Sequence, residues 1–418
     1  MNCEMSVMVG RYLTSPHAMT DRGAKLLLLA AIFFMPISTA ATNTFMGLTL
    51  LAWLIAGGFH ERFVSLRDNW FAIGTVGLVL MVCAGSFHST AEPEDILFQI
   101  HKYAKLLFML PAITLLQEDE WRKRALLAFS IAMLITLALS LISVVWPLSF
   151  VRGTASGPSD NHFVFRDHIA QNLMMSFFAL ILAVKGRFAF TSSKKILYWV
   201  LAFLSVIDIL FFVAGRTGYV SLLFNILVFL FFLGSTKQRG IALLVCAIIG
   251  VLTIQFSTTF KSRIDLAVTE YKNQDNKDLS SVGQRIEFIK KGILLIAERP
   301  LIGFGTGAHK KEFCRVAETK EWCNAGGFHP HNQFIAFGVQ LGILGILGYL
   351  LFMMTAIKEA YSENPEKKIL GVGLVATLIA DSLFHAPLFL ISEAAFFILL
   401  FPMLMSGPIV TKPKITVS

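Results

Sequence analysis

Long apolar runs separated by short polar segments make up most of the chain. Twelve of these runs hold enough apolar residues to cross a bilayer as a helix, which takes about 20 residues. They lie at approximately 26–41, 44–59, 70–87, 96–116, 125–147, 168–184, 196–214, 217–234, 240–256, 331–356, 369–387 and 390–408. The pattern predicts an all-α polytopic membrane protein with about twelve transmembrane helices.

One long hydrophilic segment, residues 257–330, interrupts the apolar runs. It divides the chain into three predicted units. Residues 1–256 hold helices one to nine, residues 257–330 form a loop domain, and residues 331–418 hold the last three helices and a polar tail.

The composition agrees with a membrane protein. Of the 418 residues, 55% are hydrophobic and only 15% are charged, so a water-soluble fold could not cover its apolar surface. This balance excludes a disordered chain, a small disulfide scaffold and an ordinary cytosolic enzyme. The net charge of +9 is therefore attributed to topology and lipid contacts, and no nucleic-acid partner is expected.

The distribution of Lys and Arg predicts the orientation. With the N-terminus inside, 19 basic residues fall in cytoplasmic segments and three in the short outer loops. Because cytoplasmic loops are enriched in Lys and Arg, both termini are predicted to be cytoplasmic and residues 257–330 to lie outside. Residues 1–24 are mixed and polar, so we expect no cleavable signal peptide.

The outer segment contains a predicted amphipathic helix. Ser281 with Gln284 resembles a capping box, and isoleucines follow at helical spacing until Pro300. This places Arg285 in the first turn, directed towards the membrane. Gly303, Gly305 and Gly307 follow in alternation, which is more typical of a flexible turn than of a phosphate-binding loop.

Two cysteines of the same segment are predicted to form a disulfide. Cys314 and Cys323 lie in a compartment that the topology makes oxidising, where thiols pair. Cys83 and Cys246 fall in apolar runs and are expected to be packing residues.

The stretch His329-Pro330-His331-Asn332 leads into the tenth apolar run. Pro330 suits the first turn of a helix, so His331 is expected at a helix N-terminus, where the backbone dipoles disfavour imidazolium. A neutral His331 could act as a base near pH 7. It could equally be an interfacial histidine without a chemical task. A metal site is not expected, because no further ligands are evident nearby and the chain has no DxD sequence.

Four arginines are predicted around the same outer boundary. Arg216 lies in a tight connection between two apolar runs, Arg285 begins the amphipathic helix, and Arg152 and Arg166 lie in the preceding outer loop. Guanidinium groups are suited to phosphates, so the set is typical of a polyanion site. Each arginine taken alone could also be a surface residue or a lipid headgroup contact.

Several ionisable residues fall within or beside apolar runs, where burying charge is costly and each is a functional hypothesis. They are His101, Lys102, Lys105, Asp208, Asp381, His385 and Glu393. For Lys102 and Lys105 we favour ion pairs with Asp208 or Asp381, and the alternative is attraction of an anionic headgroup.

The histidine stretch resembles a family signature. His331-Asn332, then nine residues, then Gly342-Ile343-Leu344-Gly345 is similar to the pattern of O-antigen ligases in the Wzy_C superfamily. Arg216 resembles the arginine just ahead of a span in that family, and Val282-Gly283-Gln284-Arg285 resembles the stretch with its second essential arginine. The layout of twelve spans with one large periplasmic segment is also similar.

The resemblance implies a GT-C-like glycosyltransferase of the bacterial inner membrane. Such an enzyme transfers O-antigen polysaccharide from undecaprenyl diphosphate to a sugar hydroxyl of lipid A–core at the periplasmic face, with inversion and without metal or cofactor. His331 takes the role of general base, and Arg216 and Arg285 stabilise the diphosphate. Arg152, Arg166, His329 and Asn332 are added as predicted substrate-binding residues.

Two other functions remain open at this point. An O-antigen polymerase has a similar topology and the same donor, but its acceptor is a second lipid-linked glycan. A transporter or lipid flippase could also use twelve spans, although no halves with matching broken helices are evident.

Overall fold

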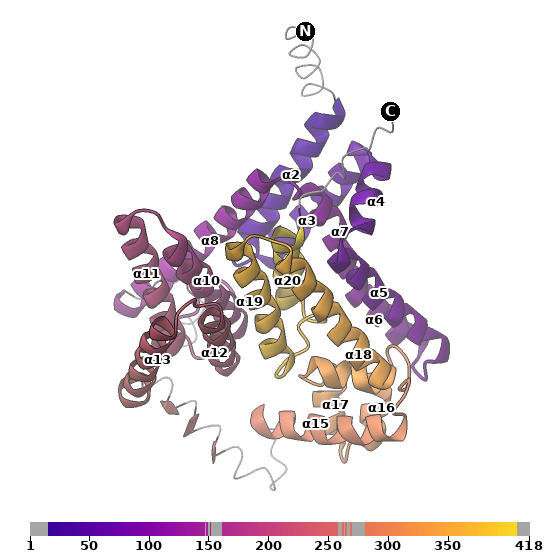
Figure 1. Ribbon diagram of the computed structural model, residues 1–418. Helices are drawn as coiled ribbons and strands as arrows, with labels where there is room; N and C mark the ends of the chain where they lie inside the picture. The colour runs from indigo at the N-terminus through magenta and orange to yellow at the C-terminus, as the bar shows by residue number, and fades with distance from the viewer. Residues whose placement is uncertain are drawn as a thin grey trace.

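The computed structural model describes residues 16–146, 148, 151, 161–257 and 281–407, with short pieces between 261 and 269. Within these residues every regular element is a helix (Figure 1). The elements are α2 (Pro16–Phe34), α3 (Thr39–Ala56), α4 (Phe59–Arg67), α5 (Trp70–Ala84), η1 (Gly85–His88), α6 (Pro93–Ala104), η2 (Lys105–Phe108), α7 (Met109–Leu115), α8 (Asp119–Val145), α10 (His168–Phe188), α11 (Ser192–Ile207), η3 (Asp208–Phe212), α12 (Arg216–Phe231), α13 (Thr236–Phe256), α15 (Ser281–Glu298), α16 (His309–Val316), α17 (Lys320–Gly326), α18 (Gln333–Tyr361), α19 (Pro365–Ser382) and α20 (Ile391–Met405).

A helix lies at each of the twelve predicted apolar runs, which confirms the all-α prediction for the described residues. Eight of these helical segments are long and apolar enough to cross a membrane: α3, α5 with η1, α6 through α7, α8, α10, α11 with η3, α13 and α18. Two further apolar helices, α12 and α20, are shorter. The remaining two positions are α2 and α19, which carry several charged residues in their first halves. The number of twelve spans stays a prediction.

Several helices begin at a polar side chain that satisfies a free backbone N–H group. Such a side chain replaces the partner that the first turn of a helix lacks. The capping residues are Ser38 before α3, Asn69 before α5, Asp167 before α10, Asn332 before α18 and Asn364 before α19.

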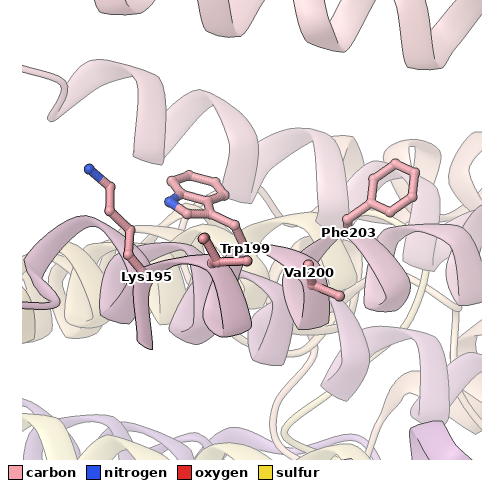
Figure 2. A pocket seen from close by; sticks show the side chains of 5 residues that line it. Lys195, Trp199, Val200 and Phe203 are labelled. Atoms are coloured by element: carbon pink, nitrogen blue, oxygen red, sulfur yellow. The ribbon is translucent and has the colours of Figure 1, made fainter. Parts of the chain in front are cut away.

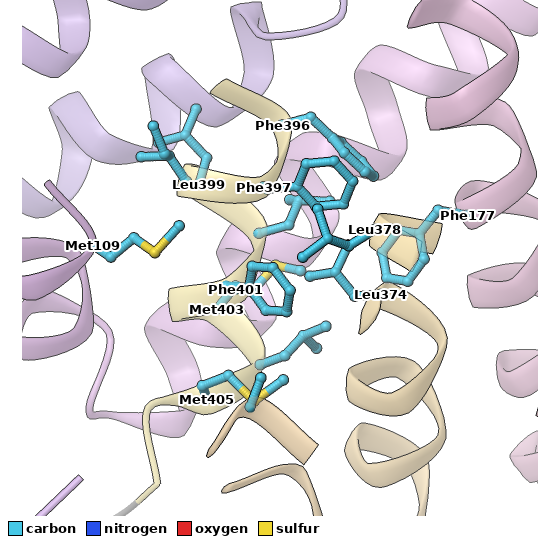
Figure 3. Packing of buried hydrophobic residues seen from close by; sticks show 14 of the residues in the cluster. Met109, Phe177, Leu374, Leu378, Phe396, Phe397, Leu399, Phe401, Met403 and Met405 are labelled. Carbon is cyan, nitrogen blue, oxygen red and sulfur yellow. The ribbon is translucent and has the colours of Figure 1, made fainter. Parts of the chain in front are cut away.

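The main core surrounds α20, which is buried along nearly its whole length (Figure 3). Phe396, Phe397 and Phe401 pack with Met109 of α7 and Leu374 of α19 in one cluster. A helix that is apolar on all sides can be enclosed by other helices or face lipid, and α20 is enclosed by other helices. The C-terminal helices therefore form the centre of the bundle.

Four ion pairs at the end predicted to be cytoplasmic join residues far apart in the sequence. They are Lys25 with Glu118 (2.6 Å), Arg62 with Asp21 (2.8 Å), Arg122 with Glu363, and Lys367 with Asp119. The first turn of α2 lies at this end, and α15, α16 and α17 lie together at the opposite end (Figure 1). The opposite end thus holds the described part of the 257–330 segment.

Helix α15 confirms the predicted amphipathic helix. It begins at Ser281 and ends at Glu298, just before Pro300. Phe288 and Leu295 are buried, whereas Ile293 of the predicted apolar face is exposed. Gly292 approaches Ile335 of α18 so closely that a Cβ there would lie 2.3 Å from the Ile335 side chain. This contact fixes α15 against the first turns of α18.

The alternating glycines do not form the flexible turn that the sequence predicts. Gly303, Gly305 and Gly307 all have positive φ, and a Cβ at each would lie within 3 Å of neighbouring backbone atoms. Only glycine fits such positions without strain. Residues 300–307, which we name the glycine strap, therefore pack as a close-fitting segment against α18 and the η1 region.

The glycine strap fills a break in α18. Gly342, the first glycine of the family-like pattern, has φ 62° and interrupts the helix. Strap backbone groups replace the lost helical hydrogen bonds: Ile343 N donates to Pro300 O (2.7 Å), and Gly305 N donates to Gln340 O (2.7 Å). A broken helix is tolerated at this depth where such partners satisfy the backbone.

Candidate functional site

The turn before α18 brings two histidines together. His331 has a positive φ of 49°, which is uncommon for a residue other than glycine. Its backbone N–H donates to Nδ1 of His329 (3.2 Å), and the two ring centroids are 4.1 Å apart. The helix begins two residues after His331, at Gln333, so the prediction that Pro330 lies in its first turn is wrong.

Asn332 explains this later start. Its side-chain oxygen accepts a hydrogen bond from Ile335 N (3.0 Å), and its Nδ2 donates to the carbonyl of Leu383 (3.1 Å). The residue is therefore the N-cap of α18 and also joins that helix to the end of α19. The predicted substrate-binding role of Asn332 stays a prediction.

A third histidine, His385, completes the cluster. It follows α19, and its ring lies 6.0 Å from the ring of His331. Its Nδ1 lies 2.9 Å from Oδ1 of the fully buried Asp381, one helical turn earlier. A carboxylate at this distance fixes the ring orientation, so Asp381 positions His385 with Nε2 directed away from the carboxylate.

Arg285 reaches the histidines from α15. Its Nη2 lies 3.4 Å from Nε2 of His385. From the same helix, Phe288 stacks on His331 with an interplanar angle of 17° and a centroid distance of 5.7 Å. The sequence predicts the direction of Arg285 but not its contact with His385.

Burial keeps the histidine pair neutral. Together with smaller electrostatic effects of the nearby His385 and Arg285, it lowers the pKa of His331 from 6.5 to about 4. Burial is also the main reason why the pKa of His329 is lowered to about 3, and electrostatic interaction with His331 is the next cause. The expected neutral state of His331 thus has a different main cause, desolvation instead of the helix dipole.

The Nδ1 atom of His331 is buried and has no hydrogen-bond partner among the described residues. Buried polar atoms are normally paired, so an open acceptor in a candidate site calls for an explanation. A neutral imidazole nitrogen that is open in this way could accept a hydrogen bond from a substrate hydroxyl. No three His, Cys, Asp or Glu side chains of the described residues are arranged to hold a metal ion.

Arg216 lies at the start of α12, on a different element from the turn that carries the histidines. It is the first residue of α12, after a turn in which Gly215 and Gly218 pack closely on Asn172 of α10. Asn172 also donates to the carbonyl of Val213 (2.8 Å), which holds the turn in place. Among the described arginines, Arg285 is the one with a hydrogen-bond contact to a histidine of the cluster.

Arg166 is buried, and its guanidinium contacts protein groups. It donates to the carbonyl of Met35 from Nε (3.1 Å) and Nη2 (2.6 Å), and it contacts Thr39 and Ser392. These bonds join the loop before α10 to α2, α3 and α20. The substrate-binding role of Arg166 stays a prediction, and Arg152 lies outside the described residues.

The predicted ion pairs of Lys102 and Lys105 with Asp208 or Asp381 are wrong. Asp381 pairs with His385, and Asp208 accepts a hydrogen bond from Ser140 (2.5 Å). Instead, the ammonium of Lys102 lies over the rings of Phe98 (5.1 Å) and Phe389 (4.9 Å).

The segment after α15 is held by covalent and packing contacts. Cys314 of α16 and Cys323 of α17 are joined by a disulfide, at the positions where the sequence predicts one. Phe313 and Trp322 from the same two helices pack on Phe288, which carries the His331 stack. This packing supports the histidine pair from the side of α15.

A hollow of about 400 Å³ on α11 is not part of the histidine cluster. It is lined by Lys195, Ile196, Trp199, Val200 and Phe203, all from one helix (Figure 2). None of the predicted site residues lines it. The candidate site is therefore defined by the histidines and Arg285.

Comparison with known proteins assigns this part of the chain. The Wzy_C family model, described as O-antigen ligase, matches residues 200–350, which include Arg216, Arg285 and the histidine turn. The match supports an O-antigen ligase-type domain in this part of the chain. The domain also contains α15, the glycine strap and the broken first part of α18. Members of the family are membrane glycosyl-transfer enzymes of O-antigen and polysaccharide assembly.

A curated protein of Haemophilus influenzae, described as uncharacterized, is also similar. It is 25% identical over 176 residues, which cover 38% of this chain and 43% of that protein. The chain thus spans less than half the length of this relative, whose description names no activity.

The Asp381–His385 pair is the part of the site that sequence reasoning did not assemble. Both residues are recognisable as ionisable groups at the end of an apolar run, four residues apart. That spacing places two side chains on the same face of a helix, so the sequence alone could have indicated that the two residues pair. Their approach to Arg285, 100 residues away, depends on how α15 packs.

Proposed function

We propose that the protein is an O-antigen ligase. It transfers O-antigen polysaccharide from undecaprenyl diphosphate to a sugar hydroxyl of lipid A–core, at the periplasmic face of the bacterial inner membrane. The observation that carries the proposal is the contact of Arg285 with His385, beside the buried and neutral His331, inside the region that matches the O-antigen ligase family model.

The donor already carries a good leaving group, the diphosphate, so the main task of the protein is to neutralise the negative charge of that group. As the anomeric carbon–oxygen bond breaks, the electron pair stays on the diphosphate. Guanidinium groups stabilise such charge electrostatically. We assign this role to Arg285 and Arg216, with Arg285 nearest to the histidines.

The acceptor hydroxyl must lose its proton as its oxygen bonds to the anomeric carbon. We assign the proton to the imidazole of His331, which is neutral and whose buried Nδ1 has no hydrogen-bond partner among the described residues. A base must lie within hydrogen-bond reach of the proton that it removes. Attack from the face opposite the diphosphate would invert the anomeric centre.

His385 has a positioning role in this scheme. Asp381 orients its ring, and its Nε2 faces the guanidinium of Arg285. The pair therefore holds Arg285 beside the base before the donor arrives. A preorganised cation costs little reorganisation in the transition state.

In vitro ligation tests the proposal. Purified protein is mixed with lipid-linked O-antigen and lipid A–core, with no nucleotide and no added metal. Polysaccharide attached to lipid A–core, lost in His331→Ala, is the expected result. Longer lipid-linked glycan without attachment to lipid A–core would instead identify a polymerase, and translocation without any new glycosidic bond would identify a flippase.

A further inference from the structure

An aromatic cluster with one cation lies beside the histidine pair. We name it the Lys102 cluster: Lys102 and Phe98 of α6, Phe328 before the histidine turn, and Phe389 before α20. The rings of Phe98 and Phe389 flank the ammonium, and Phe328 lies 5.3 Å from Phe389 and 6.4 Å from Phe98. The cluster continues to His329, whose ring is 5.4 Å from that of Phe328.

In the part of the chain that the structure describes, no acidic partner balances the charge of Lys102. The residue is only 9% exposed and belongs to a membrane-spanning segment, and no carboxylate within the described ranges forms an ion pair with it. Contact with two ring faces compensates part of the desolvation cost of a buried ammonium. An anion bound at the cluster would offset the rest of the desolvation cost of the Lys102 ammonium.

Two rings of the cluster are not covered by other described parts of the chain. Phe328 is 58% exposed and Phe98 is 44% exposed. Flat, exposed rings next to a cation offer an apolar surface for the C–H face of a sugar and a charge for an acidic group on it.

The cations Arg285 and Lys102 approach different histidines of the His329–His331 pair. Arg285 approaches His331 through His385, whereas Lys102 approaches His329 across the ring of Phe389, which is 6.0 Å from the His329 ring. If Arg285 holds the donor diphosphate, as the proposed function assigns, the Lys102 cluster remains for the second substrate.

We propose that the Lys102 cluster is the acceptor subsite. The rings of Phe328 and Phe98 support the sugar that presents the reacting hydroxyl to His331, and Lys102 binds an anionic group of the acceptor glycolipid. This inference rests on the proposed function, because it requires a glycolipid acceptor.

Separate measurement of the KM for acceptor and for donor tests the subsite, with purified protein, lipid A–core and lipid-linked O-antigen. Lys102→Gln should raise the KM for lipid A–core by about tenfold, the usual effect of losing a hydrogen bond to a charged group. The KM for the donor should stay unchanged, and Lys102→Arg should restore most of the acceptor affinity because it keeps the charge. Phe328→Ala, at a position that is 58% exposed, should raise the same acceptor KM.

Lys105→Gln is the matched control. It removes the same charge three residues further along, where the ammonium lies over no ring among the described residues. The subsite assignment is overturned if Lys102→Gln raises the donor KM instead, if Lys105→Gln has the same effect, or if Lys102→Gln and Phe328→Ala both leave the acceptor KM unchanged. Absence of any ligation by the wild-type protein would refute the proposed function itself, which is a distinguishable result.

Discussion

The pH dependence of the reaction is the sharpest test of the base. A histidine with the ordinary pKa of 6.5 is only about 9% neutral at pH 5.5, whereas one with a pKa of about 4 is about 97% neutral. If the rate follows the neutral fraction of His331, acidification from pH 7.5 to 5.5 should leave kcat/KM nearly unchanged. With an unburied histidine the same change would lower it about tenfold.

The cause of the low pKa can be tested with one substitution. Phe288→Ala removes the ring stacked on His331 and admits water, so the midpoint of the acid limb should rise from about 4 towards 6.5. Phe313→Ala is the control, since Phe313 packs on Phe288 at 5.3 Å and belongs to the same buried group without stacking on His331. The assay is initial ligation rate at fixed substrate between pH 4 and 7.5, with folding checked by size-exclusion profile. A wild-type midpoint near 6.5, or equal shifts in the two variants, would refute the reasoning.

Four further outcomes are expected. Arg285→Ala should lower kcat by about 100-fold or more, and Arg285→Lys should recover only part of it because it lacks the planar fork, as measured by ligation kinetics. Asp381→Asn should lower kcat without changing the KM for lipid A–core, because it loosens the orientation of His385; a change confined to KM would contradict this. Gly305→Ala should lower the melting temperature in detergent, since its Cβ would lie 2.1 Å from backbone, whereas Gly77→Ala, with open space around it, should not. Activity should survive EDTA, and a loss that Mg²⁺ reverses would show that a metal takes part.

Acid should also weaken the folded state through the same histidines. Their folded pKa values lie below the ordinary 6.5, so the unfolded chain binds more protons between about pH 6.5 and 3. The stability contribution is therefore complete above pH 6.5 and is lost as the pH falls through about 4 for His331 and about 3 for His329. This window defines the range in which the rate assay needs the folding check.

The apolar pattern predicts the helices well because the bilayer requires long apolar segments with satisfied backbones. Helix α15 is also predictable, since Ser281 and Pro300 mark its limits and its periodicity is helical. The start of α18 is not, because Pro330 and Asn332 are both acceptable start signals and only the tertiary contact of Asn332 with Leu383 decides between them.

Long-range contacts limit the prediction of the site. The family-like pattern places His331 and Arg285 correctly in one region, but the partner of Lys102 depends on packing. Asp381 is four residues from His385, and this local pair takes the carboxylate that Lys102 was expected to use. The close packing of the strap glycines cannot be predicted from the sequence for a related reason. Alternating glycines permit flexibility, and only the fitted backbone around Gly305 shows that closeness of approach is what requires them.

The contact of Gly292 with Ile335 fixes the position of α15 along α18, and therefore the position of Arg285 relative to the histidines. Arg285 and Gly292 are seven residues apart, so they lie on nearly the same side of the helix and roughly 10 Å apart along its axis. Inserting one residue between them would rotate the guanidinium by about 100° and turn it away from His385. The segment between Arg285 and Gly292 should therefore tolerate substitutions far better than insertions or deletions.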